Sequence, residues 1–382
     1  MVNYTFTQNV KVVVGKNSVE QLGDILIQEG FSKALLVYDK GIEAAGILSR
    51  IERALEGKKL EYVEFGKVLP DPPAGIINEG AQLCKESNCD CIVAIGGGSS
   101  IDTGKGINIL RFNKGEILDY AVKEIAVCDG LIVVPTTAGT GSELSNGAIV
   151  TDLETGAKVP ILCFNDMPDY AILDPELTLG MPYGLTLMTG LDAFSHAAES
   201  YTSVNANSMT DLVCEKVMTT VIENLPIVLR EPQNVEAREK MQCVAAMGGW
   251  MLYSASAHVG HSIAHVLGAH FHMPHGATCA YTLPSVFKLL ASIMPDKIAY
   301  IGRLLGAEIN SEMACGEIGR QAAEAFVHFT EGLGLPPVNV PDLSEQEIEN
   351  LVEKIVEEPL AAFSPIEIDK NLARKMIQDL VQ

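Results

Sequence analysis

The chain has 382 residues, of which 47% are hydrophobic and 20% charged, so it is not disordered and is long enough for two domains. The net charge of −22 repels nucleic-acid phosphates and anionic lipids, and we set aside roles at nucleic acids or membrane surfaces. Nine cysteines without a Cys-x-x-Cys pair indicate a reducing, cytoplasmic compartment. The N-terminal residues lack the order of a signal peptide.

Short apolar runs alternate with amphipathic stretches in the first part of the chain. Strands are expected at residues 11–14, 34–38, 60–65, 91–95 and 131–134, with helices near 18–30, 42–55, 75–87 and from about 100. The first helix is predicted to open with the capping box Ser18-Val-Glu-Gln21. Strands that are apolar throughout predict a parallel, Rossmann-like sheet covered by helices on both faces.

Helical periodicity replaces this alternation after about Pro182, and we predict an α/β domain over residues 1–181 and an all-helical domain over residues 182–382. Residues 241–287 contain no Asp, Glu, Lys or Arg but six of the eight histidines. Glycines and prolines interrupt this stretch too often for a membrane span, so it is interpreted as a buried helical centre. The acidic residues 344–358 are expected to form a solvated helix face.

A glycine-rich turn, Gly96-Gly97-Gly98-Ser99-Ser100, follows the strand at 91–95 and opens a helix. Glycines let backbone N–H groups approach an anion, and the helix N-terminus favours negative charge, so the turn predicts a phosphate site rather than only a tight connection. It matches neither the dinucleotide fingerprint, since residue 101 is Ile, nor a Walker A loop.

Two further features lie at strand ends. Residues 135–143 follow the strand at 131–134 with hydroxyls and glycines, which suits either ligand contact or a plain polar turn. Asp39 ends the strand at 34–38, where a carboxylate could bind ribose hydroxyls and repel a 2′-phosphate, favouring NAD over NADP. An exposed turn aspartate is an equally good interpretation of Asp39 alone.

The second half carries a set of potential metal ligands. Asp192 and His196 are four residues apart, which places them on one helix face, and His261 and His265 repeat this spacing. His275 follows Pro274 at a turn. This mixture of one carboxylate and several imidazoles suits Fe²⁺ or Zn²⁺ and is poor for Ca²⁺ or Mg²⁺. His258, His270 and His272 are interpreted as structural or at the rim of the site.

With these motifs together, the sequence resembles the iron-containing (group III) alcohol dehydrogenases from about residue 5 to residue 380. The resemblance implies a dehydroquinate synthase-like fold with the ligand in a cleft between the two domains. It implies metal ligands at Asp192, His196, His261 and His275, and a proton relay near the nicotinamide at His265. Dinucleotide contacts are implied at Asp39, Gly96, Gly97, Gly98, Ser99, Ser100, Thr136, Thr137, Ser145, Lys158 and Leu179.

The resemblance further implies an NAD(H)-linked alcohol dehydrogenase or aldehyde reductase for small primary alcohols, diols or aldehydes, assembled as a homodimer or larger oligomer. Ser100 and Asp71 depart from the residues that many members carry, and Asp71 affects an expected adenine-side contact. A cleft lining is expected from Phe194, Tyr253, His258, Phe271 and Cys279.

Three alternative functions remain open. A synthase or lyase resembling dehydroquinate synthase would use NAD transiently, but residues 241–287 offer no Lys or Arg for an anionic substrate. A glycerol-type or maleylacetate-type dehydrogenase of the same superfamily would differ in its metal. The last alternative is a protein that binds metal or NAD without catalysis.

Overall fold

The computed structural model describes residues 4–162, 167–341 and 343–381, which form two compact units. One unit comprises Thr7–Met181 and Pro232–Trp250, and the other comprises Pro182–Glu231, Met251 to the C-terminus and the N-terminal segment up to Phe6. Residues 232–250, which were predicted to lie in the helical domain, group with the α/β unit. There Gly249 packs directly on Gly141, and a Cβ at Gly249 would lie 1.8 Å from the Gly141 carbonyl oxygen.

The α/β unit is built on a six-stranded, all-parallel sheet, which confirms the predicted fold class. Its strands follow the spatial order β1-β8-β5-β4-β2-β3. Their bounds are β1 Lys11–Val14, β8 Tyr170–Leu173, β5 Leu131–Pro135, β4 Cys91–Gly96, β2 Lys33–Val37 and β3 Glu61–Phe65. The inner strands β4 and β5 are buried at every residue, as expected for a sheet covered on both faces.

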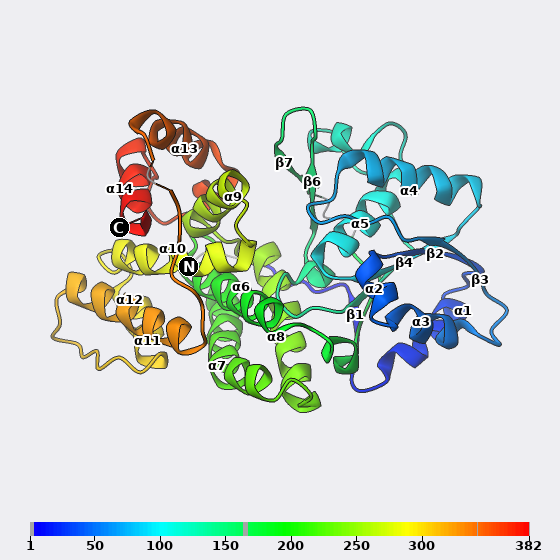
Figure 1. Cartoon of the computed structure of the whole chain (residues 1–382), viewed down its shortest axis with the longest axis horizontal. Coiled ribbons are helices and arrows are strands. Elements are labelled where there is room, and N and C mark those ends of the chain that lie inside the picture. Colours follow the sequence, from blue (N-terminus) through cyan, green and yellow to red (C-terminus); the bar gives the residue numbers. More distant parts are fainter. Residues whose placement is uncertain (1–3, 163–166, 342, 382) are drawn as a thin grey trace. The chain divides into compact units, whose positions relative to one another are not determined.

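Helices cover both faces of this sheet, with α3 (Ile47–Leu55) and α4 (Ala74–Glu86) on opposite sides (Figure 1). On one face, α1 (Leu22–Gln28) and α3 pack on alternate strand residues such as Leu36 and Val93. On the other face, α5 (Gly98–Phe112) approaches Ala94 through Gly104, where an added Cβ would lie 2.5 Å from the Ala94 Cβ. This glycine contact lets α5 pack closely on β4, the strand that precedes it in the chain.

Three local predictions were wrong or incomplete. Ser18 does not cap a helix, because residues 18–21 form a 3₁₀ turn (η1) whose N-cap is Asn17. The helix expected over 42–55 is two helices, α2 (Lys40–Ala44) and α3, separated at Gly46 with φ 71°. The strands β6 (Gly147–Thr151), β7 (Lys158–Leu162) and β8 were not predicted; β6 and β7 form a separate antiparallel pair.

The second unit is helical, as predicted from its periodicity (Figure 1). Its elements are α6 Tyr183–Thr202, α7 Ser208–Arg230, the end of α8 Val235–Ser254, α9 Val259–Phe271, α10 His275–Leu290, α11 Pro295–Leu304, α12 Cys315–Gly332, α13 Glu345–Glu357 and α14 Lys370–Val381. Helix α10 packs against α6, α9 and α12, which makes it the central helix of the unit. Its close approach to α6 occurs at Gly276, where a Cβ would lie 2.1 Å from the Met188 carbonyl oxygen.

The histidine-rich stretch at 241–287 forms the end of α8, α9 and α10, and most of its apolar residues are buried. Among the described residues, we find no helix whose length and apolar character would let it cross a membrane. The eight cysteines within the described residues are free thiols.

Candidate metal centre and dinucleotide site

Helices α6, α9 and α10 bring the four predicted metal ligands to one point inside the helical unit. Asp192 and His196 lie one turn apart on α6, and the His196 Nε2 atom is 3.5 Å from the Asp192 Oδ1 atom. His261 near the start of α9 and His275, the first residue of α10, direct their Nε2 atoms at the same oxygen, at 4.0 and 3.5 Å. The Nε2 atoms of all three imidazoles therefore lie within 4.0 Å of Asp192 Oδ1.

Most of this cluster is hidden from solvent. The side chains of Asp192, His196 and His261 are at most 4% exposed, whereas that of His275 is 37% exposed. Among the described residues, neither Asp192 Oδ1 nor His261 Nε2 has a hydrogen-bond partner. Buried polar atoms without partners are costly, and an ion that binds both atoms would remove that cost.

The protonation of the α6 pair suits cation binding. Burial lowers the pKa of His196 to about 4, although Asp192 opposes the shift, so the imidazole is neutral at neutral pH. Burial opposes ionisation of Asp192, but the neighbouring His196 and the other imidazoles lower its pKa on balance. A neutral imidazole beside an ionised carboxylate is the state in which both groups bind a metal.

A second buried carboxylate, Glu199, stands behind His261 and was missed in the sequence analysis. It lies on α6 two helical turns after Asp192, and its Oε2 atom hydrogen-bonds the Nδ1 atom of His261. Its Oε1 atom accepts the backbone N–H groups of Gly260 at 2.7 Å and His261 at 3.3 Å. Burial opposes ionisation of Glu199, but His261 and His258 lower its pKa to about 2. The spacing of seven residues between Asp192 and Glu199 places both carboxylates on the same face of a helix, and this spacing could have identified Glu199.

His265, the predicted proton relay, lies beside the cluster and is not at its centre. Its ring stacks on that of His275 with centroids 5.3 Å apart, and 26% of its side chain is exposed. Its Nδ1 atom is 2.8 Å from Oε1 of Glu358, a residue that ends α13 and also accepts the Ser262 hydroxyl at 2.7 Å. Glu358 was predicted to be on a solvated face, but its side chain is only 16% exposed.

Two residues that were expected to line a cleft have other roles. Phe194 is fully buried and stacks on Phe326 with ring centroids 5.2 Å apart, so it belongs to the core. His258 is also fully buried, and its Nε2 atom lies 2.9 Å from the Thr202 hydroxyl, in agreement with its structural interpretation. His270 and His272 are exposed, away from the buried part of the cluster.

In the α/β unit, most of the predicted dinucleotide contacts gather at the carboxyl ends of β2, β4 and β5. Strands β2 and β4 are neighbours in the sheet. The chain leaves β2 toward β3 on one side, and it leaves β4 toward β5 on the opposite side. This change of direction is a topological switch point, where open α/β sheets bind ligands. Asp39 follows β2 and the Gly96–Ser100 turn follows β4, so the two flank the switch point; the Ser100 hydroxyl lies 3.5 Å from Asp39 Oδ2.

The glycine turn is compact, and its shape explains its composition. Gly96 has φ 143°, and a Cβ there would lie 2.4 Å from the Ser100 hydroxyl oxygen. Side chains at Gly97 and Gly98 would press on Thr137 and Thr140, while the Thr136 N–H donates to the Gly96 carbonyl at 2.9 Å. The turn leads directly into α5, whose N-cap Gly97 provides no side-chain cap for the first-turn N–H groups, and these groups suit a diphosphate.

The remaining predicted contacts lie elsewhere in the α/β unit. Ser145 accepts the buried Lys105 ammonium at its hydroxyl, 3.1 Å, and at its carbonyl, 2.9 Å. Lys158 on β7 forms an ion pair with Asp71 at 2.6 Å, and the carbonyl of Leu179 accepts the Gln233 amide at 3.2 Å. Asp39 itself caps α2 by accepting the Gly41 N–H at 2.6 Å. The sequence analysis had foreseen none of these intramolecular partners.

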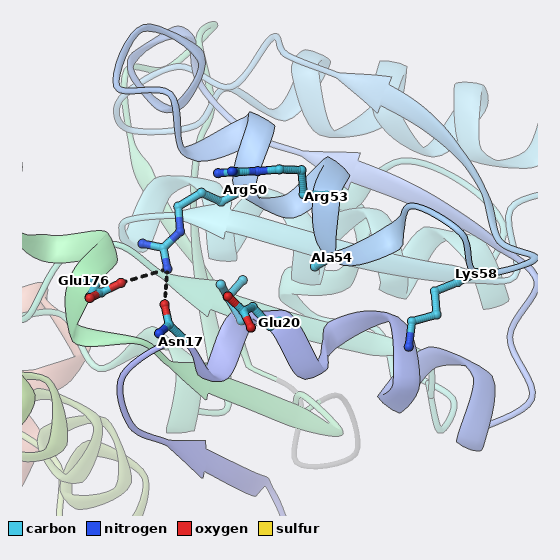
Figure 2. Close-up of a pocket in the computed structure, with 8 residues that line it drawn as sticks. Asn17, Glu20, Arg50, Arg53, Ala54, Lys58 and Glu176 are labelled. Atoms are coloured by element: carbon cyan, nitrogen blue, oxygen red, sulfur yellow. Dashed lines mark hydrogen bonds and ion pairs between the residues drawn. The ribbon is translucent and has the colours of Figure 1, made fainter.

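A hollow of about 510 Å³ in the α/β unit has none of the predicted site residues in its lining (Figure 2). It is lined by Asn17, Val19, Glu20, Arg50, Arg53, Ala54, Lys58 and Glu176. Its most buried cation, Arg50, already pairs with Asp174 and Glu176 at 3.2 Å each. The hollow therefore presents no unsatisfied charge from Arg50 for a ligand.

The helical cluster fits a divalent cation. Donor atoms bound to one tetrahedral ion lie ~3.3–3.8 Å apart, which follows from metal–ligand distances of about 2.0–2.3 Å. The observed separations of 3.5 to 4.0 Å around Asp192 Oδ1 are close to that range. The glycine turn likewise fits a dinucleotide, because it leads into the N-terminus of α5, a position that favours phosphate, and its three glycines leave no room for side chains against Ser100, Thr137 and Thr140.

Comparison with known proteins gives a consistent picture. The family model for iron-containing alcohol dehydrogenase matches residues 9–175, and the model for the C-terminal part of the Fe-containing alcohol dehydrogenase family matches residues 186–381. The chain is 33% identical to the NAD-dependent methanol dehydrogenase of Bacillus methanolicus, over 97% of this chain and 96% of that protein. It is also 33% identical to the 1,3-propanediol dehydrogenase of Klebsiella pneumoniae, over 84% of each chain. The structure of sulfoacetaldehyde reductase from Bifidobacterium kashiwanohense in complex with NAD⁺ matches with a TM-score of 0.90 and 26% identity, over 100% of both chains.

Proposed function

Because the chain belongs to the iron-containing alcohol dehydrogenase family, we propose that it transfers hydride between NAD(H) and small primary alcohols, diols or aldehydes. The observation that carries the proposal is the convergence of three imidazole Nε2 atoms on one buried carboxylate oxygen. The proposed ligands of a divalent cation are Asp192, His196, His261 and His275. Relatives that act on methanol and 1,3-propanediol support a small substrate with one or two hydroxyls.

When bound, Fe²⁺ or Zn²⁺ supplies Lewis-acid polarisation of the substrate oxygen. The side chains of the protein supply the rest. Buried Asp192 and His196 would hold the ion away from solvent, and His275 is the partly exposed member of the cluster. His265, next to His275, is proposed to pass the proton of the alcohol toward solvent, with its Nδ1 atom held by Glu358.

Asp39 and the Gly96–Ser100 turn are proposed to bind the dinucleotide in the α/β unit. The N–H groups at the start of α5, which no side chain caps, suit the diphosphate, and the Asp39 carboxylate suits the ribose hydroxyls. Since a carboxylate repels a 2′-phosphate, we expect NAD to be preferred over NADP. Thr136, Thr137, Ser145, Lys158 and Leu179 remain predicted contacts.

A cytoplasmic location is proposed from the free thiols, and a homodimer or larger assembly from the family resemblance.

The proposal is tested with protein loaded anaerobically with Fe²⁺ or Zn²⁺, by following NADH formation with a panel of alcohols and diols. We expect one NADH per alcohol oxidised, which a synthase that recycles NAD would not release. His261→Ala should lose bound metal and turnover while keeping NAD affinity, and His270→Ala, an exposed histidine on the same helix, should lose neither. Full metal content and turnover in His261→Ala would overturn the proposal.

A further inference from the structure

A sulfur atom lies at the metal centre in addition to the four proposed ligands. Cys279 is one turn after His275 on α10 and is fully buried. Its Sγ atom is 3.6 Å from the Nε2 atom of His275. One potential donor atom from each of Asp192, His261, His275 and Cys279 lies within 4.8 Å of all the others.

These distances match those within one coordination sphere. A thiolate sulfur and an imidazole nitrogen on one five-coordinate ion, at about 2.3 and 2.0–2.1 Å from it and separated by 90–120°, lie ~3.1–3.8 Å apart. The Cys279–His275 separation of 3.6 Å falls within this range. Two nine-tenths-buried groups without a hydrogen-bond partner among the described residues, Asp192 Oδ1 and His261 Nε2, belong to the same set. They are an observation independent of the cysteine, and they point to a bound cation as their partner.

We propose that Cys279 Sγ is a further ligand of the metal, so that the centre combines carboxylate, imidazole and thiolate donors. This inference rests on the metal centre of the proposed function. As the Sγ–metal bond forms, the Sγ–H bond breaks and its proton passes to solvent, which leaves the oxidation states unchanged. A thiolate is a soft donor, and it selects Zn²⁺, Fe²⁺ or Co²⁺ more strongly against Mg²⁺ and Ca²⁺ than the Asp and His residues do alone.

The position of Cys279 has a second chemical interpretation, a hydrogen bond between the thiol and His275. In that case the sulfur would keep its proton and would contribute nothing to the ligand field. Spectroscopy distinguishes these two states directly, because only a metal-bound thiolate transfers charge to the ion when it absorbs light.

The experiment uses the full chain, stripped of metal and loaded with one equivalent of Co²⁺ under anaerobic conditions. Visible ligand-field bands report binding at the centre, and a near-ultraviolet sulfur-to-cobalt charge-transfer band reports thiolate ligation. We expect both in the natural protein. Cys279→Ser and Cys279→Ala should lose the charge-transfer band, and Cys315→Ser, a half-buried thiol at the start of α12, should keep it.

If the variants fold poorly, the spectrum of the cobalt-loaded natural protein still tests whether the sulfur is a ligand. Ligand-field bands without the charge-transfer band would overturn sulfur ligation and leave the metal centre intact. If His261→Ala retains the ligand-field bands unchanged, the metal centre of the proposed function itself is wrong. Zn²⁺ affinity is measured by competition against a chromophoric chelator, and Cys279→Ser should bind Zn²⁺ at least ~10-fold more weakly. Loss of a residue that only supports a metal ligand already weakens binding ~10–100-fold, so loss of a ligand should cost at least the lower value. An unchanged Zn²⁺ affinity would also count against the sulfur.

Discussion

The carboxylate of Glu199 hydrogen-bonds the Nδ1 atom of His261, and both side chains are at most 3% exposed. In the neutral imidazole that binds a metal, an Nδ1–H group donated to this carboxylate leaves the lone pair on Nε2, the atom that faces Asp192. The same carboxylate accepts the Gly260 N–H, where a Cβ would lie 2.7 Å from Oε1. Glu199 thus fixes the tautomer of His261 and the start of α9 together.

Glu199→Gln should therefore weaken metal binding without removing a ligand. The amide carries no charge, and it supports the imidazole less strongly than a carboxylate does. We expect a ~10–100-fold lower affinity for Zn²⁺, measured by chelator competition. Glu223→Gln, an exposed change on α7, should leave the affinity unchanged, and an equal affinity in both variants would contradict the role given to Glu199.

Glu358→Gln should slow turnover and leave alcohol binding nearly unchanged. The carboxylate holds Nδ1 of His265 at 2.8 Å, and burial opposes its ionisation while His265 lowers its pKa. We expect kcat to fall roughly 10-fold, a part of the 10²–10⁴-fold that a positioned proton donor or acceptor contributes. The exposed Glu353→Gln on the same helix is the control. A rise in KM with constant kcat would instead assign Glu358 to substrate binding.

Removal of the charge at Asp39 should broaden cofactor use. Asp39→Asn keeps an N-cap for α2, since Asn caps as well as Asp, but it no longer repels a 2′-phosphate. The ratio of kcat/KM for NADP to that for NAD should rise at least ~10-fold, which corresponds to about 1.4 kcal/mol. Asp39→Gly should change the ratio in the same direction. A constant ratio in both variants would remove Asp39 from the ribose site.

Gly276→Ala should disturb the metal centre through the backbone. The new Cβ would lie 2.1 Å from the Met188 carbonyl oxygen and would push α10, with His275, away from α6. Overpacking of this kind costs about 1–3 kcal/mol of unfolding free energy. Denaturant unfolding should show that loss together with weaker metal binding. Gly316→Ala on α12, where no atom lies within 4 Å of the Cβ, should be neutral or stabilising; equal losses would refute the steric argument.

Helical spacing made much of the candidate centre predictable. The i, i+4 pairs Asp192/His196 and His261/His265 share helix faces in the structure, as their spacing required. Cys279 follows His275 at the same spacing but had been interpreted only as part of a cleft lining. Glu358 could not be found this way, because its contact with His265 joins two helices distant in sequence.

The fold shows the same division between local and long-range information. Apolar runs predicted β2, β4 and β5, because buried parallel strands are apolar on both faces. The edge strands β1 and β3 were also predicted, β3 from its alternation, and most of their residues are exposed. Apolar runs did not predict β6 and β7, whose residues are alternately or partly exposed. The grouping of residues 232–250 with the α/β unit depends on contacts such as Gln242 to the Pro135 carbonyl, 3.2 Å, and no local pattern encodes these.

Anomalous diffraction from crystals of the zinc-loaded protein, recorded on both sides of the zinc absorption edge, tests the central claim most directly. The account predicts one strong peak within bonding distance of Asp192 Oδ1 and of the Nε2 atoms of His196, His261 and His275. A peak at another place in the chain, or a loaded and active enzyme with no density among these four side chains, would contradict it.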